Sequence, residues 1–135
     1  MRNLFAVALG LAVAVCAVMA VEVVGHSLYP PPPGLSLDDL KGFSDYVASA
    51  PILALAFVLL AWGAGAFTGG AVAALVATGR RTHRFGLLVG AIVLAMGAMT
   101  LWLIPHPTWY ILATPFACLI PGWFGGLVGA RREPV

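Results

Sequence analysis

The sequence predicts an all-α polytopic membrane protein, with four transmembrane helices in a compact bundle and a short amphipathic helix in the first outer loop. Hydrophobic residues make up 61% of the chain and charged residues only 9%, and the mean hydropathy of +1.01 is too high for an ordinary soluble domain. The apolar residues also fall into runs of the roughly 20 residues that a helix needs to cross a bilayer. We therefore expect a single membrane domain over residues 1–135.

The first predicted span covers residues 4–26 and follows a short start that contains Arg2. A positive start and small residues such as Val18 and Ala20 before a cleavage point are also typical of a signal peptide. The apolar run is longer than the core of most signal peptides, which has about 7–15 residues. We expect a retained span, and a cleaved signal peptide is the alternative.

The outer loop at residues 27–50 contains a run of prolines, Pro30 to Pro33, which favours a stiff polyproline II segment. Ser36 followed by Asp39 resembles a capping box, with Asp in place of Glu. Apolar residues then recur at helical spacing, at Leu37, Leu40, Phe43 and Val47. Residues 37–48 are therefore predicted to form a short amphipathic helix on the membrane surface.

The other three spans are predicted at residues 51–77, 85–104 and 110–130. The second span starts at a proline, which suits the first turn of a helix. Pro115 and Pro121 lie within the fourth span. We expect these two prolines to bend that helix and to free carbonyl groups that neighbouring helices must satisfy.

The distribution of basic residues predicts the orientation of the spans. Lys41 stands alone on one side of the membrane, and the other side carries Arg2, Arg80, Arg81, Arg84, Arg131 and Arg132. The positive-inside rule places both termini and the middle loop in the cytoplasm. Trp102, Trp109 and Tyr110 then mark the outer interface. Because topology accounts for the basic residues, we expect no nucleic-acid partner.

Small residues recur at a spacing of four and predict close helix packing. In the second span they are Ala61, Gly65, Gly69, Ala73 and Ala77. Gly86 with Gly90, and Gly122 with Gly126, make the same motif in the third and fourth spans. We expect these faces to pack within one chain, and a dedicated dimer interface is the alternative.

The sequence carries no recognised catalytic signature, because HExxH, Walker, GxSxG and CxxC motifs are all missing. Cys16 and Cys118 each lie inside an apolar run, where an isolated thiol usually behaves as a small hydrophobe. We therefore expect no catalytic residues, no cofactor, no metal and no enzymatic activity.

Polar residues gather at the predicted outer end of the bundle and form the candidate site. They are Glu22, His26, Tyr29, His106 and Tyr110. Glu22 and His26 are four residues apart, so they are close enough on a helix to bond each other. An acidic residue in a span is costly and is therefore a functional hypothesis by default. Three interpretations stay open: a polar helix end, a metal or proton site, and a pocket for a lipid or small molecule.

The residues Glu22-Val23-Val24-Gly25-His26, followed by Tyr29 and the proline run, resemble segments of uncharacterised small four-helix bacterial membrane proteins. The residues from Glu22 to Gly25 also resemble the first-helix acidic motif of the small multidrug resistance transporters. That resemblance implies four helices and a carboxylate that couples drug export to protons. Here the carboxylate lies nearer the outer end of its helix, and the following loop is longer than in that family.

Two functions are expected from these features. The first is a non-enzymatic accessory or structural component of a membrane, and the second is a small oligomeric transporter or channel with an acidic site at Glu22. The expected partners are the lipid bilayer and either further copies of the chain or a larger membrane complex. The expected location is a bacterial inner membrane. The inner halves of the spans offer few polar residues beyond Thr68 and Thr78, which favours the first function.

Overall fold

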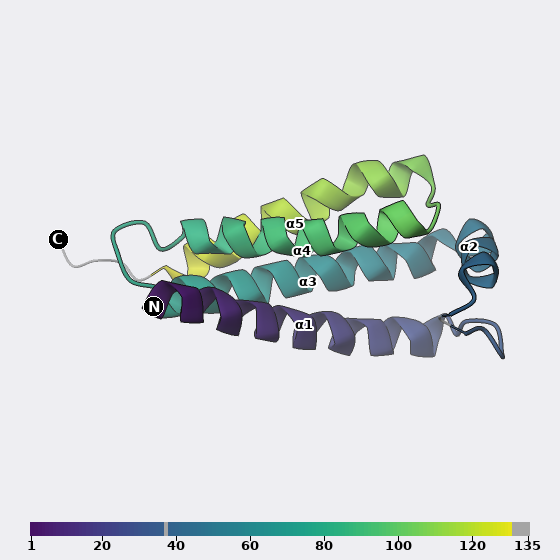
Figure 1. The fold of residues 1–135 in the computed structure, drawn as a ribbon, viewed down its shortest axis with the longest axis horizontal. Coiled ribbons are helices and arrows are strands. Elements are labelled where there is room, and N and C mark those ends of the chain that lie inside the picture. Colours follow the sequence, from purple (N-terminus) through teal and green to yellow (C-terminus); the bar gives the residue numbers. More distant parts are fainter. Residues whose placement is uncertain (37, 131–135) are drawn as a thin grey trace.

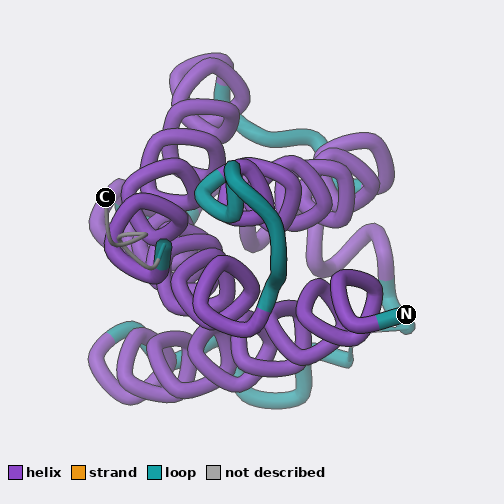
Figure 2. Tube along the Cα trace, turned by 90° about the vertical axis from the view of Figure 1, so that its left-hand side faces the viewer, coloured by secondary structure: helices purple, strands orange, loops and turns teal. Residues whose placement is uncertain are grey.

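The computed structural model describes residues 1–36 and 38–130, and all the regular structure in this part of the chain is helical (Figure 2). The helices are α1 (Arg2–Leu28), α2 (Leu40–Ser49), α3 (Ile52–Val76), α4 (Arg84–Leu103) and α5 (Thr108–Gly129). Four of them, α1, α3, α4 and α5, are long and apolar enough to cross a membrane. The predicted all-α class and the four apolar helices are confirmed, and each of these helices ends within two residues of its predicted bounds.

The four long helices run along the long axis of the molecule, and the short helix α2 lies at one end of it (Figure 1). We call this the α2 end. The N-terminus and the connection between α3 and α4 lie at the opposite end, which we call the terminal end. Figure 2 views the bundle from the terminal end and shows that connection crossing in front of the helices.

Helix α3 is the centre of the bundle, because it packs against α1, α4 and α5, whereas α1 and α4 have little contact with each other. The face of α3 toward α1 contains Gly65 and Gly69. A Cβ on Gly65 would lie 2.8 Å from the carbonyl oxygen of Ala14, and one on Gly69 would lie 2.7 Å from the Ala14 Cβ. Only a residue without a side chain leaves room for these two helices to approach so closely.

Glycines also mediate the contacts of α5 with α4 and α3. A Cβ on Gly86 would overlap backbone atoms of Gly122 and Gly126, and one on Gly90 would lie 2.7 Å from the carbonyl oxygen of Cys118. On the α3 side, a Cβ on Gly125 would overlap the carbonyl of Phe67. All these contacts lie in the half of the bundle nearer the terminal end, which is packed backbone against backbone.

Polar contacts tie the first residues of α1 to the end of α3 and to Thr78, which follows it. The Asn3 side chain accepts a hydrogen bond from the Thr78 backbone N–H at 2.8 Å and donates one to the Thr78 carbonyl at 3.2 Å. Arg2 Nε donates to the Val76 carbonyl at 3.2 Å. These bonds supply partners for carbonyl groups that the end of a helix leaves without an intrahelical donor.

The two prolines of α5 are accommodated within a continuous helix, Thr108–Gly129. Just before Pro115, the Thr114 hydroxyl donates to the Tyr110 carbonyl at 2.8 Å. Pro121 has no N–H, so the carbonyl of Ala117 loses its usual donor. That carbonyl faces α3 at Gly63, where a Cβ would lie 3.1 Å from the oxygen. A glycine on the neighbouring helix therefore makes room for the group that the proline frees.

The connection from α1 to α2 turns at Gly34, whose φ of +84° disfavours any residue with a side chain. The Leu35 N–H donates to the Pro32 carbonyl across this turn at 3.3 Å. The predicted start of the following helix was wrong, since α2 begins at Leu40 and not at residue 37. Its N-cap is Asp39, which accepts a hydrogen bond from the Gly42 N–H at 3.0 Å.

Ser36 does not cap α2, because its hydroxyl accepts a bond from the Asp38 N–H at 3.3 Å and lies within the turn that precedes the helix. Leu37, which was expected to open the amphipathic helix, lies outside the described residues. Arg131 and Arg132, which contributed to the predicted orientation, lie outside them as well. The arginines that the structure does describe, Arg2, Arg80, Arg81 and Arg84, belong to the terminal end.

Helix α2 packs onto the end of the bundle. Its Val47 is buried in a cluster with Leu55 of α3, Tyr110 of α5 and Ile104, the residue that follows α4. Phe43 and Tyr46 pack against the same cluster. One side of α2 therefore covers the space between the ends of the long helices.

We expect Gly69→Leu to lower the free energy of unfolding by about 3 kcal/mol, because the new side chain must force α3 away from the α1 backbone. The measurement is denaturation of the purified protein in a mild detergent. Leu60→Ala is the control, since Leu60 is 58% exposed on the same helix and its loss removes little packing. Equal stability of the two variants would show that α1 and α3 do not meet through Gly69.

Candidate functional site

A cavity of about 480 Å³ lies at the α2 end, and every helix of the fold contributes to its lining. We call it the α2-end cavity. Representative lining residues are Glu22 from α1, Phe43 from α2, Trp62 from α3, Thr100 from α4 and Tyr110 from α5. The cavity exists because the helices that are in backbone contact in the terminal half are held apart here by larger side chains.

All five residues of the predicted polar site line this one cavity. Glu22, His26 and Tyr29 come from the last turns of α1 and the residue after it, and His106 and Tyr110 come from the connection before α5 and its first turn. Residues that are far apart in the sequence therefore share one site, because α1 and α5 both have these residues at the α2 end.

Glu22 and His26 line the cavity without bonding each other. Within residues 1–36 and 38–130, no hydrogen bond or ion pair involves the Glu22 carboxylate, which is half-buried, while His26 is exposed. The described residues also include no group of three or more His, Cys, Asp or Glu side chains placed to hold a metal ion. The Glu22 side chain thus lines the cavity, and none of the described residues forms a hydrogen bond or ion pair with it.

Tyr110 is the centre of the aromatic wall, and only 1% of its surface is exposed. Its ring meets the Trp62 ring edge to face, with centroids 6.1 Å apart and an angle of 71°. On another side it stacks on the His106 ring, with centroids 4.8 Å apart and an angle of 22°. Trp109 approaches Tyr110 edge-on at 5.6 Å. These contacts hold the rings that line the cavity in defined orientations.

The hydrogen bond of His106 determines what its ring presents to the cavity. Nδ1 lies 2.7 Å from the carbonyl oxygen of Ile104. A carbonyl only accepts, so Nδ1 must carry the proton, and in the neutral ring Nε2 is then an acceptor. Together with the carboxylate of Glu22, this nitrogen is a hydrogen-bond acceptor among the residues that line the cavity.

The opposite wall and the cover of the cavity come from α3 and α2. Phe57 of α3 lies 6.0 Å from the Tyr29 ring and packs beside Gly25, where a Cβ would lie 3.2 Å from the Phe57 Cβ. Phe43 and Tyr46 of α2 line the cavity from the far end. The interior is therefore mostly aromatic and aliphatic, with a small number of polar groups.

Several lining residues were not in the predicted site. On α3 they include Ala54, Val58 and Trp62, which are spaced by four and so lie on one helix face. That spacing was the available signal, but these residues are apolar and look like ordinary packing positions. Phe43 and Tyr46 were missed because α2 was expected to rest on the membrane surface instead of packing onto the bundle.

Comparisons with protein-family models, with curated proteins and with solved structures find no match for this chain. Its function therefore has to follow from the chemistry and shape of the α2-end cavity. A concave, mostly apolar site with a few convergent polar groups is the usual form of a small-molecule site in a protein.

Substitution of Tyr110 tests the aromatic wall. We expect Tyr110→Ala to lower the free energy of unfolding by about 3–5 kcal/mol, because it removes a fully buried ring. Tyr110→Phe should change stability little, since no described residue forms a hydrogen bond with the Tyr110 hydroxyl. Denaturation in mild detergent measures both. The control is Ile111→Ala, because Ile111 is the next residue on α5 and is 44% exposed. A large loss in Tyr110→Phe would contradict this account of the wall.

Proposed function

We propose that this chain is a non-enzymatic membrane component that crosses the bilayer four times and holds a small amphipathic molecule in its α2-end cavity. The cavity is the observation that carries the proposal. Its volume of about 480 Å³ falls within the roughly 300–1,000 Å³ typical of small-molecule sites. Its walls are aromatic, and Glu22, Tyr29 and His106 supply polar groups on one side.

The surface of the bundle supports insertion in a membrane. All four long helices expose large apolar side chains, among them Leu9, Val15, Leu60, Leu88, Met99, Leu112 and Phe116. Such a continuous apolar surface is unfavourable in water and is covered by hydrocarbon chains in a bilayer. Only helices and closed barrels satisfy their backbone groups in that environment, and these helices do so.

The charges support the orientation that the sequence predicts. Arg2, Arg80, Arg81 and Arg84 belong to the terminal end, and Lys41 belongs to α2. The positive-inside rule places the terminal end in the cytoplasm and the α2-end cavity on the outer side. The resemblance to small bacterial membrane proteins makes an inner membrane the expected location.

The positions of the glycine faces favour a function based on a bound ligand over one based on a protein docked to these faces. Gly65 and Gly69 are covered by α1, and Gly86 and Gly90 are covered by α5. A second chain has no access to these faces unless the bundle separates. The proposed role as an accessory component therefore rests on the cavity, and a homo-oligomer or larger complex would use other surfaces.

A small transporter is the second candidate. The observation that favours it is the Glu22 carboxylate, which lines the cavity and pairs with none of the described residues. Transport also needs a path through the terminal half of the bundle. There the backbones of Gly70, Gly86 and Gly122 are in contact, and the Thr68 hydroxyl is bonded to the Ala64 carbonyl of its own helix at 2.8 Å. This packing favours a protein that binds a ligand without transporting it, which is the first candidate function.

Reporter fusions test the orientation. A fusion after Gly79, between α3 and α4, is expected to report the cytoplasm, because that connection carries Arg80 and Arg81. A fusion after Gly34, between α1 and α2, is expected to report the far side. Paired phosphatase and fluorescent-protein reporters measure the two sides. The same location for both fusions would rule out the four-span arrangement.

Filling the cavity tests the binding role. The chain is purified in mild detergent, and organic extracts are analysed by mass spectrometry for a molecule present in stoichiometric amount. We expect the wild type to retain such a molecule and Ala54→Phe to lose it, since Ala54 lines the cavity. Ala20→Phe is the matched control, because Ala20 is exposed on α1 and does not line the cavity. Equal contents in wild type and Ala54→Phe would refute the binding role.

A further inference from the structure

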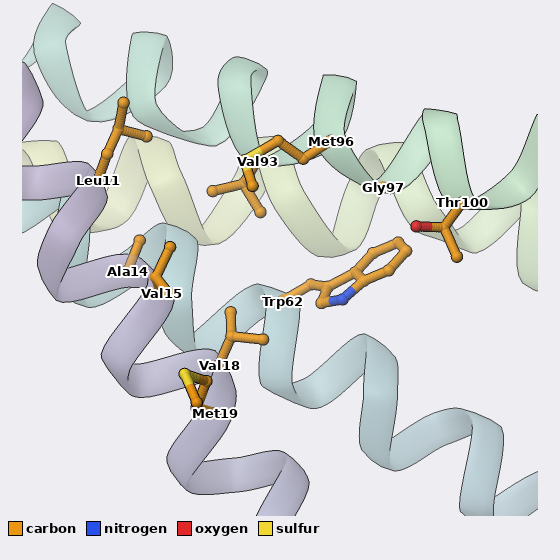
Figure 3. Close-up of a pocket in the computed structure, with 10 residues that line it drawn as sticks. All are labelled: Leu11, Ala14, Val15, Val18, Met19, Trp62, Val93, Met96, Gly97 and Thr100. Atoms are coloured by element: carbon orange, nitrogen blue, oxygen red, sulfur yellow. The ribbon is translucent and has the colours of Figure 1, made fainter. Parts of the chain in front are cut away.

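A second cavity of about 240 Å³ opens as a groove between α1 and α4, and Trp62 of α3 also lines it (Figure 3). We call it the α1–α4 groove. It is lined on one side by Leu11, Val15 and Met19 of α1 and on the other by Val93 and Met96 of α4. The groove exists because both helices pack against α3 but have little contact with each other.

The lining of the groove is almost wholly apolar, and its rim faces outward. Val15, Met19 and Met96 are all exposed on the surface that hydrocarbon chains would cover. The stretch from Leu11 to Met19 corresponds to about 12 Å of helix at 1.5 Å per residue. The groove is thus a slot with an apolar entrance on the side of the bundle.

The groove and the α2-end cavity are neighbours that share two lining residues. Trp62 and Thr100 line both spaces. The Trp62 ring packs directly against Gly97 of α4, where any Cβ would overlap it, and it also contacts the Tyr110 ring. Figure 3 shows Trp62 and Thr100 at the same end of the groove. An occupant that bends past this point would have one part in an apolar slot and another in a site with polar groups.

We propose that the occupant is a bilayer lipid with an ammonium headgroup, with one acyl chain in the α1–α4 groove and the headgroup in the α2-end cavity. This inference rests on the proposed function and names its ligand class. The sideways apolar opening fits a hydrocarbon chain, which is what surrounds the groove in a bilayer. The Glu22 carboxylate and the acceptor nitrogen of His106 fit the ammonium group of such a headgroup, which is positively charged and donates hydrogen bonds.

The fluorescence of Trp62 provides a direct test. In the full chain, Trp102→Phe, Trp109→Phe and Trp123→Phe leave Trp62 as the one tryptophan. This protein is placed in phosphatidylglycerol vesicles with increasing amounts of phosphatidylethanolamine brominated midway along its acyl chains. Bromine quenches tryptophan on contact. We expect quenching that saturates at a low proportion of the brominated lipid, because a defined site fills.

The headgroup part of the proposal is tested with brominated phosphatidylglycerol as the second probe. We expect the phosphatidylethanolamine probe to reach half-saturation at about fivefold lower mole fraction, which corresponds to about 1 kcal/mol. Glu22→Gln should abolish this preference and leave the quenching by both probes in place. A preference unchanged by Glu22→Gln would overturn the assignment of the headgroup to the Glu22 side of the cavity.

The position of the chain is tested by narrowing the groove. Val15→Phe is expected to remove the saturable quenching, and Met96→Phe provides the same test from the opposite rim. Val24→Phe is the matched control, because Val24 is exposed on α1 but does not line the groove. Quenching that rises in proportion to the bulk lipid, and that neither rim variant changes, would overturn the inference.

These outcomes are separate from those of the proposed function. If Ala54→Phe loses the extracted molecule but Trp62 shows no saturable quenching, the binding role stands and the lipid assignment fails. If extraction finds no difference and rim variants still remove the quenching, the groove binds a chain and the α2-end cavity is not the binding site. The extract itself identifies the ligand, and a molecule without an acyl chain would contradict the inference.

Discussion

Backbone contact between helices, made possible by glycine, is the interaction on which the rest of this structure depends. Gly69 meets Gly10 and Ala14, and Gly86 meets Gly122 and Gly126, at distances that leave no room for a Cβ. In a bilayer the hydrocarbon chains are as apolar as leucine, so helices gain little by merely hiding apolar side chains. Close van der Waals packing is then the main attraction. Helix α3 carries this packing on more than one face and holds the other three long helices in place.

The cavity at the α2 end is a consequence of how residue size changes along the same helices. In the terminal half α3 presents glycine and alanine, whereas toward the α2 end it presents Phe57 and Trp62. Tyr110 of α5 adds a third large ring at the same level. All three of these rings line the cavity. Helix α2 closes that space with Val47 packed on Leu55 and Tyr110.

The positions of the four long helices could be predicted because hydropathy and proline mark them directly. The glycines at a spacing of four were recognisable, and they lie where helices contact each other. The polar site could be anticipated from the positions of its residues along the predicted spans. Glu22 lies near the end of one helix and Tyr110 near the start of another, so both are expected at the same side of the membrane. The covering of the cavity by α2 could not be predicted from the sequence, because Phe43 and Tyr46 contact residues that are distant in the sequence.

Local signals were ambiguous where two residues were equally suited to one role. Ser36 and Asp39 are both good helix caps, and in the structure Asp39 caps α2 while Ser36 bonds within the preceding turn. The spacing of Glu22 and His26 permits a bond, but spacing does not say whether two side chains turn toward each other or toward a shared cavity. The cavity itself arises from unfilled space between helices, which no pattern along a single helix records.

The bonds between Asn3 and Thr78 have a consequence for how the chain assembles as it is synthesised. The two residues are 75 positions apart, so the start of α1 gains these partners only when α3 is complete. Gly10 and Ala14 of α1 likewise gain their packing partners only when α3 is present. At that moment α1 and α3 can form all their mutual contacts, before α4 and α5 exist. The pair is therefore a self-contained first unit, onto which the later hairpin of α4 and α5 docks through its own glycines.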